Sequence, residues 1–143
     1  MNQLAVLECH TEAVACLTVW NNCLYSGSDD NAIRKWNENG EYVATFQDPT
    51  NNVLCLTVWN NCLYSGSYNG TIRERNKNGE CVAVFKGHTD VVWCLTVWNN
   101  HLYSGSDDNT ICKWNKNGEC VATLHGHTEA VLCLIVWNNS LYS

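Results

Sequence analysis

The chain has 143 residues and a formal net charge of −6, from 14 acidic and 8 basic side chains. The basic residues form no run, so we expect no nucleic-acid partner, because such partners are held through their phosphates. The longest apolar stretches have about eight residues, whereas a membrane-spanning helix needs about 20, and residues 1–10 lack the basic and apolar regions of a secretory signal. We therefore expect no membrane association and a cytoplasmic location.

A unit of 39 residues repeats along the whole chain, and its clearest marker is the spacing of Trp20, Trp59, Trp98 and Trp137. Around each tryptophan stands the same string, Val-Trp-Asn-Asn-x-Leu-Tyr-Ser. Fixed self-similarity at this period is typical of repeat architectures built from one supersecondary unit.

Four short strands are predicted in each repeat, and the first repeat shows them in chain order. The period-two alternation and the β-branched residues indicate strands, while Asn-Asn and Asn-Gly pairs are hairpin signals. The predicted order is strand Val14–Trp20, turn Asn21-Asn22, strand Cys23–Ser28, polar turn 29–31, strand Ala32–Trp36, turn Asn39-Gly40 and strand Tyr42–Phe46. Four antiparallel strands in about 40 residues predict an all-β fold built from β-propeller blades.

Ten cysteines would suggest disulfides in a secreted domain, but their spacing follows the repeat. Cysteines at equivalent positions of neighbouring units are usually too far apart to bridge, since their Cα atoms must come within about 7 Å. We expect free thiols that pack as small apolar side chains in a reducing compartment. The largest such group is Cys16, Cys55, Cys94 and Cys133.

The third repeat carries the motif that identifies a family. Gly87-His88, the strand Leu102–Ser106, Asp108, Thr110-Ile111 and Trp114 resemble the WD40 motif, and the resemblance covers essentially the whole chain. The tight first hairpin and the Gly-Glu-Cys segments make the repeats most similar to WD40 domains of the F-box/WD40 type. The chain departs from the family pattern by closing its third strand with Trp-Asn instead of Trp-Asp.

Two repeats contain a His, Ser, Asp and Trp set that admits two interpretations. A Ser-His-Asp set suggests a nucleophilic triad, but this set recurs once per repeat. The resemblance implies that each set is instead a hydrogen-bonded structural tetrad, so we expect no catalytic residues and no enzyme activity. The two sets are His10, Ser26, Asp30 and Trp36, and His88, Ser104, Asp108 and Trp114.

The second repeat has lost three of its four tetrad residues. Pro49, Asn69 and Arg75 stand where the other repeats have His, Asp and Trp. A half-satisfied buried network is worse than none, so we predict that this blade is the least stable one.

Metal and cofactor sites are not expected. His125, His127 and the Cys9-His10 pair lack the ligand spacing of a zinc site. We interpret His127 as a tetrad histidine and His125 as an exposed loop residue.

Residues that diverge from the repeat pattern are the candidates for a binding face. In the family, the loops that join strand four to strand one and strand two to strand three line the usual binding face. Tyr, Trp and Arg are favoured as interface anchors. The candidates are Tyr68, Trp93, Arg73 and Arg75, and drift without function is the competing interpretation.

The repeats do not fill a whole number of blades, because four full repeats would take 156 residues, 13 more than the chain has. Family rings have seven or eight blades, so we expect a second copy of the chain to complete the ring, each copy lending its first strand to the other. The alternatives are that the chain is part of a longer repeat protein, or that it joins end to end in an open assembly. We divide the chain into 1–7 as a lone fourth strand, 8–46, 47–85 and 86–124 as repeats one to three, and 125–143 as a partial fourth.

The resemblance implies a non-enzymatic scaffold that binds protein or peptide on its loop face as an oligomeric propeller. Two alternatives remain open. One is a structural repeat protein that assembles into a ring or an open filament without a separate ligand. The weaker one is a lectin-like propeller with one ligand pocket per blade, which repeat two disfavours because its residues differ.

Overall fold

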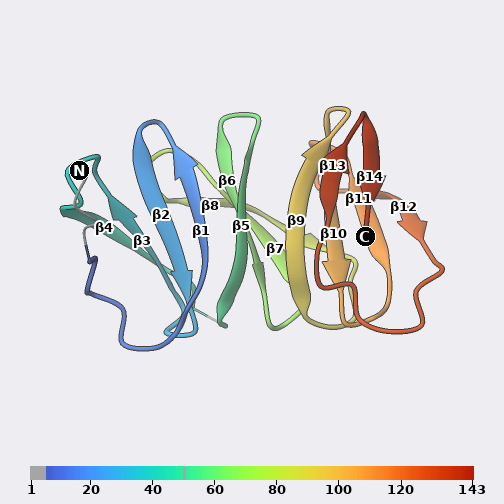
Figure 1. The fold of residues 1–143 in the computed structure, drawn as a ribbon, viewed down its shortest axis with the longest axis horizontal. Coiled ribbons are helices and arrows are strands. Elements are labelled where there is room, and N and C mark those ends of the chain that lie inside the picture. Colours follow the sequence, from blue (N-terminus) through green and yellow to red (C-terminus); the bar gives the residue numbers. More distant parts are fainter. Residues whose placement is uncertain (1–5, 50) are drawn as a thin grey trace.

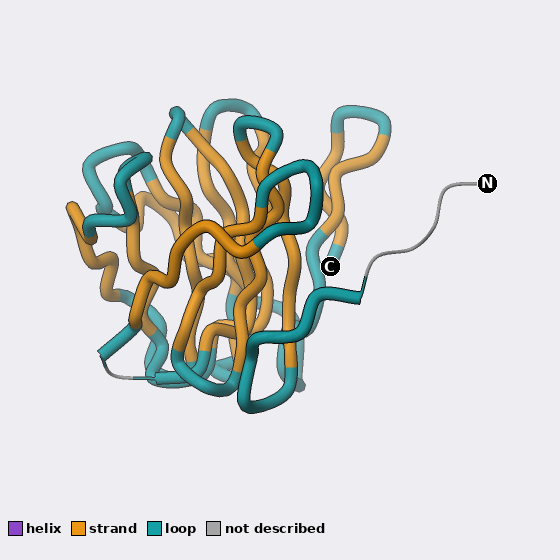
Figure 2. Tube along the Cα trace, turned by 90° about the vertical axis from the view of Figure 1, so that its left-hand side faces the viewer, coloured by secondary structure: helices purple, strands orange, loops and turns teal. Residues whose placement is uncertain are grey.

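The computed structural model describes residues 6–49 and 51–143, and these contain strands and turns but no helix (Figure 2). Three sheets of four strands and one two-stranded hairpin follow one another along the chain. The predicted all-β architecture of propeller blades is thereby confirmed, as a partial propeller of about four blades.

Each complete sheet is a meander in which every strand pairs antiparallel with the next. We call the sheets blades 1 to 3 and the hairpin the C-terminal hairpin. Blade 1 holds β1 (Val14–Trp20), β2 (Cys23–Ser28), β3 (Ala32–Trp36) and β4 (Tyr42–Gln47); blade 2 holds β5 (Val53–Trp59), β6 (Cys62–Ser67), β7 (Thr71–Arg75) and β8 (Cys81–Lys86); blade 3 holds β9 (Val92–Trp98), β10 (His101–Ser106), β11 (Ile111–Trp114) and β12 (Cys120–Leu124); the hairpin holds β13 (Ile135–Trp137) and β14 (Ser140–Tyr142).

The strand boundaries of the first repeat agree with those predicted to within one residue. The Asn-Asn turns adopt the left-handed backbone that the hairpin requires, with φ of 49° at Asn21 and 58° at Asn22. Differences appear at the two ends of the chain. The predicted first strand of the partial repeat starts only at Ile135, and the predicted lone fourth strand lies mostly outside the described residues, while Val6 and Leu7 are not in a strand.

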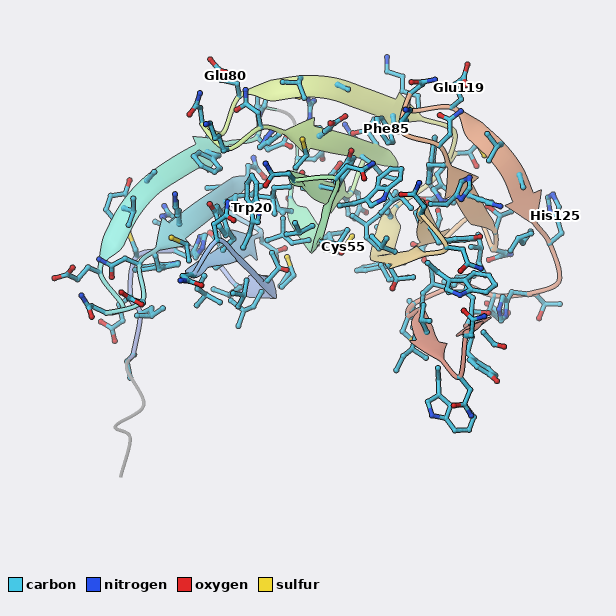
Figure 3. All side chains as sticks on the ribbon, turned by 90° about the horizontal axis from the view of Figure 1, so that it is seen from above. Trp20, Cys55, Glu80, Phe85, Glu119 and His125 are labelled. Atoms are coloured by element: carbon cyan, nitrogen blue, oxygen red, sulfur yellow. The ribbon has the colours of Figure 1, made fainter. Side chains whose placement is uncertain are left out.

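The blades stand side by side, with β1, β5 and β9 along one edge and β4, β8 and β12 along the other (Figure 1). Viewed from above, they fan out along an arc, with Glu80 and Glu119 on its outer rim (Figure 3). The turns between the first and second strands (1–2 turns) and between the third and fourth strands (3–4 turns) lie at one end of every blade. The 2–3 turns and the connections between blades lie at the other, which we call the loop end.

The core lies between blades, where side chains of one sheet pack on the next. One cluster joins blades 1 and 2, a second joins blades 2 and 3, and a third joins blade 3 to the C-terminal hairpin. Gly66 shows how closely the sheets approach, since a Cβ placed there would lie 2.7 Å from Val92 Cγ1 of the next blade. A glycine in the second strand of each blade therefore makes room for the following blade.

Candidate functional site

A chain of hydrogen bonds runs through the core of blade 1. Trp36 Nε1 lies 3.0 Å from Ser26 Oγ, Ser26 Oγ lies 2.7 Å from His10 Nε2, and His10 Nδ1 lies 2.9 Å from Asp30 Oδ2. The residues come from three separate places: the segment before β1, the second and third strands, and the turn between those strands. The network therefore ties the segment that precedes the blade to the middle of the sheet.

The same chain of bonds recurs in blade 3. Trp114 Nε1 lies 2.8 Å from Ser104 Oγ, which lies 2.6 Å from His88 Nε2, and His88 Nδ1 lies 2.7 Å from Asp108 Oδ2. The structure thus brings together all eight residues of the two predicted tetrads, four in each blade.

Proton positions in these networks follow from the indole, which can only donate. The serine oxygen accepts from the tryptophan N–H, so we assign the serine hydroxyl as donor to Nε2 and the Nδ1–H as donor to the aspartate. Ser104 is fully buried and accepts a hydrogen bond from the buried Trp114. An arrangement in which the hydroxyl is committed and out of reach of a substrate suits a structural network better than a nucleophile.

The two aspartates should make the unfolding free energy depend on acid pH. Burial alone would raise the pKa of Asp30, but hydrogen bonds from Arg34, His10 and the Thr11 backbone outweigh it and lower the pKa well below its usual range. For Asp108, bonds from Thr110, His88 and the Thr89 backbone likewise outweigh burial and lower its pKa. A carboxylate with a lowered folded-state pKa stabilises the fold above the unfolded-state pKa and loses that effect as the pH falls through the folded value.

Urea unfolding at a series of pH values checks this linkage. We expect the free energy of unfolding to decrease as the pH falls below about 4, the usual pKa of aspartate. The variants Asp30→Asn and Asp108→Asn should be less stable near pH 7 and should show a flatter decrease. Asp90→Asn, at an exposed position outside both networks, is the control. Equal acid dependence in all four proteins would contradict the assignment.

Blade 2 replaces the hydrogen-bonded network with an ion-pair cluster centred on Asp48. The Asp48 side chain is fully buried, and its Oδ2 lies 3.1 Å from Arg73 Nε and 3.5 Å from Arg75 Nη2. Arg75 occupies the tryptophan position and is buried as well. The second repeat has therefore exchanged its network for a different one, which the sequence interpretation missed.

The other two replaced positions of blade 2 do not join this cluster. Pro49 is exposed, and Asn69 bonds within its own turn, where Ser67 Oγ lies 2.7 Å from its Oδ1. Ser65, at the tetrad serine position, is buried, and its Oγ has no hydrogen-bond partner among the described residues. Burial lowers the pKa of Arg75 while the Asp48 carboxylate opposes the shift, so the cluster works against a desolvation cost. That blade 2 is the least stable stays a prediction.

The four candidate binding residues separate into two pairs. Arg73 and Arg75 point into the Asp48 cluster, so Arg75 lies in the core and not on a binding surface. Tyr68 lies in the β6–β7 turn at the loop end and is 58% exposed. Trp93 lies in β9 at the same end of the blades.

Trp93 owes its position to an irregularity in the sheet. The pairing of β9 with β10 shifts register between Cys94 and Val92, so Trp93 is the extra residue of a bulge. Its indole Nε1 donates to Asp107 Oδ1 at 2.6 Å, in the 2–3 turn of the same blade. The bulge therefore directs the half-buried Trp93 toward the loop end.

The histidines of the partial repeat lie as follows. His125 is exposed, and His127 Nε2 lies 2.5 Å from Ser143 Oγ, the residue at the tetrad serine position. Across residues 6–49 and 51–143, no three His, Cys, Asp or Glu side chains are grouped to hold a metal ion. Within the same residues, no helix is long and apolar enough to cross a membrane.

Comparison with known proteins gives one family and several structures. The family model described as WD domain, G-beta repeat matches residues 1–37, 40–74, 79–115 and 118–142. No curated protein matches the chain at a significant level.

Among solved structures, U3-55K is 28% identical with a TM-score of 0.83, and the match covers 88% of this chain and 43% of that one. The RRP9 WD40 repeats match equally well, at 28% identity and a TM-score of 0.83, over 88% and 42% of the two chains. The computationally designed Ika4 protein is 26% identical with a TM-score of 0.85, over 99% and 91%. The chain thus spans less than half the length of U3-55K and of the RRP9 repeats.

Proposed function

Because the chain belongs to the WD40 repeat family, whose propellers generally mediate protein interactions and are generally not enzymes, we propose that it is a non-enzymatic scaffold in the cytoplasm. It binds a protein or peptide at the loop end and acts as an oligomeric propeller. Fold alone does not fix function, so the proposal depends on which side chains are exposed at the loop end.

The exposed Tyr68 carries the proposal. The first and third repeats have Asp29 and Asp107 at the same position, and both contact polar neighbours: Asp29 accepts from Asn52 and Asp107 accepts from Trp93. Tyr68 is mostly exposed, and an exposed aromatic ring on a rigid turn is a frequent interface anchor. Trp93, which lies at the same end of the blades, is the second residue that favours the loop end as the binding face.

The experiment starts by finding the partner at this position. A photo-crosslinking amino acid at Tyr68 is used to capture it, and the purified partner is then titrated against variants. Tyr68→Asp and Trp93→Leu restore residues that other repeats carry at these positions, so the fold should tolerate both. We expect each to weaken binding by about 1–3 kcal/mol, as for an aromatic anchor.

The matched control is Lys77→Glu, in the 3–4 turn of the same blade. It also introduces a residue from another repeat, since Glu38 holds this position in the first, but it lies at the opposite end of the blade. Binding should be unchanged in this variant. Full affinity in Tyr68→Asp, or an equal loss in Lys77→Glu, would exclude the loop end as the binding face.

A second candidate function is structural, with assembly itself as the role. The observation that favours it is the apolar surface at both ends of the array: Leu17, Val19, Ile135 and Trp137 are all mostly exposed. A lectin-like role finds less support, because the core residues of blade 2 differ from those of blades 1 and 3.

A further inference from the structure

One set of four apolar residues recurs in every blade, on the face that is turned toward the preceding blade. The set has the order Val, Leu, Val, Leu, and its members, except Val136, pack against the preceding blade wherever a blade precedes them. We call these residues the leading set. They are Val14, Leu17, Val19 and Leu24; Val53, Leu56, Val58 and Leu63; Val92, Leu95, Val97 and Leu102; and Val131, Leu134, Val136 and Leu141.

Only the first leading set lacks a cover among the described residues. Val53 and Val92 are fully buried, whereas Val14, the equivalent residue of blade 1, is 51% exposed. Leu17 and Val19 are more exposed still. The same side chains that stabilise two blade interfaces therefore form an uncovered apolar strip on blade 1.

The surface that receives a leading set also recurs. We call the Cys, Trp and Tyr on the face of each blade that is turned toward the following blade the trailing set. In blade 1 these are Cys16, Trp20 and Tyr25, which pack on the leading set of blade 2. In the C-terminal hairpin none of the residues that the structure describes covers the trailing set. Trp137 is 63% exposed where Trp20 is 6% exposed.

Two interblade hydrogen bonds recur with fixed spacing. The cysteine Sγ of the trailing set donates to the carbonyl of the leading valine, as from Cys16 to Val53 at 3.8 Å and from Cys94 to Val131 at 3.7 Å. At two of the three interfaces the tryptophan Nε1 donates to an asparagine in the 1–2 turn that follows, as from Trp20 to Asn61 at 3.3 Å, whereas Trp59 Nε1 has no partner among the described residues. Trp98 makes the same bond to Asn139 at 3.4 Å.

The two uncovered surfaces lie at opposite ends of the arc (Figure 3). Blade 1 presents a leading set without its trailing set, and the C-terminal hairpin presents a trailing set without its leading set. Each end of the array is thus the complement of the other, in residue type and in spacing.

We infer that a second copy of this chain covers both surfaces, head to tail, with the leading set of blade 1 in one copy seated on the hairpin of the other. This deepens the proposed oligomeric propeller by naming its interface. In that contact Trp137 Nε1 donates to Asn22 of the second copy, and Cys133 Sγ donates to the Val14 carbonyl of the second copy. The contact forms twice around a two-fold axis, which closes the assembly.

Sedimentation analysis of the full chain and two valine variants tests the interface. The unmodified chain should sediment as a particle of twice the chain mass of 16.1 kDa. Val19→Asp places a charge in the proposed contact and should weaken association by about a hundredfold or more, because an unpaired buried charge is costly. Val82→Asp is the control, since Val82 is 54% exposed even though blade 2 has a neighbour on each side.

Two asparagine variants keep the test independent of any folding defect. Asn22→Ala removes the proposed acceptor for Trp137 and should weaken association by about tenfold. Asn100→Ala is the matched control. Asn100 holds the equivalent turn position in blade 3, but Trp59 Nε1, the donor equivalent to Trp137 Nε1, has no hydrogen-bond partner among the described residues. Far-ultraviolet circular dichroism checks that all four variants are folded.

A folded monomer at all concentrations would overturn the inference, and so would open polymers that grow with concentration. An equal effect of Asn22→Ala and Asn100→Ala would overturn the hydrogen bond across copies. These outcomes leave the binding test at Tyr68 unaffected, so the interface and the scaffold function fail or succeed separately.

Discussion

Replacing Asp48 with asparagine is expected to lower the free energy of unfolding by about 3–5 kcal/mol, the usual cost of breaking a buried ion pair. The Asp48 side chain is fully buried and contacts both Arg73 and Arg75. Arg75 is itself buried, so the substitution leaves its charge without the carboxylate that offsets its desolvation. Urea unfolding followed by circular dichroism measures the loss.

A double-mutant cycle separates the ion pair from the packing. Asp48→Ala combined with Arg75→Leu removes both charges, and replacing a buried pair by apolar residues is often nearly neutral. We therefore expect the double variant to be more stable than Asp48→Ala alone. Additive losses would show that the two side chains do not interact, and would contradict the cluster.

Replacing Trp114 with alanine should cost about 3–5 kcal/mol of unfolding free energy, the range for a large aromatic side chain in a core. The indole is fully buried, its ring centroid lies 5.7 Å from that of Phe85 in blade 2, and it donates to Ser104. The substitution thus creates a cavity at the interface of two blades and breaks the blade 3 network.

Trp114→Phe is the matched variant, because it keeps most of the ring and removes the N–H. We expect a smaller loss of about 1–3 kcal/mol, since buried Ser104 loses its donor. Equal stability of the alanine and phenylalanine variants would show that interblade packing by the indole contributes little. That result would contradict the interface as described.

The fold could be predicted because the same strand and turn pattern recurs in each repeat. The strand pattern, the Asn-Asn turn and the Asn-Gly turn recur at a fixed spacing, so each prediction had several independent supports. The shortened first strand of the C-terminal hairpin was not predicted. Among the described residues only blade 3 packs against that hairpin, and the sequence pattern alone does not show how many residues of a strand are paired.

The ion-pair cluster of blade 2 was not predicted, because the sequence pattern shows which residues are lost but not what replaces them. Asp48 stands one position before Pro49, where the third repeat has Gly87. A charge at a glycine position, together with Arg75 at a tryptophan position, was a signal of a compensating pair. The sequence contains no distances, so this signal did not distinguish a buried ion pair from two separate surface charges.

The binding-face prediction failed for Arg75 for the same physical reason. Arginine is favoured at interfaces, but an arginine that replaces a core tryptophan keeps the core position of that residue, and Arg75 is buried beside Asp48. Tyr68 differs because it replaces an aspartate in a turn, and it is exposed there.

Alkylation of the cysteines in the unmodified chain tests the central claim that the two ends of the array cover each other. Cys133, Cys81 and Cys120 are all exposed in the single chain, but only Cys133 lies in the proposed contact. Peptide mass spectrometry after brief treatment with iodoacetamide compares their labelling. The head-to-tail assembly predicts that Cys133 is protected while Cys81 and Cys120 are labelled; labelling of Cys133 at the same rate as the other two would contradict it.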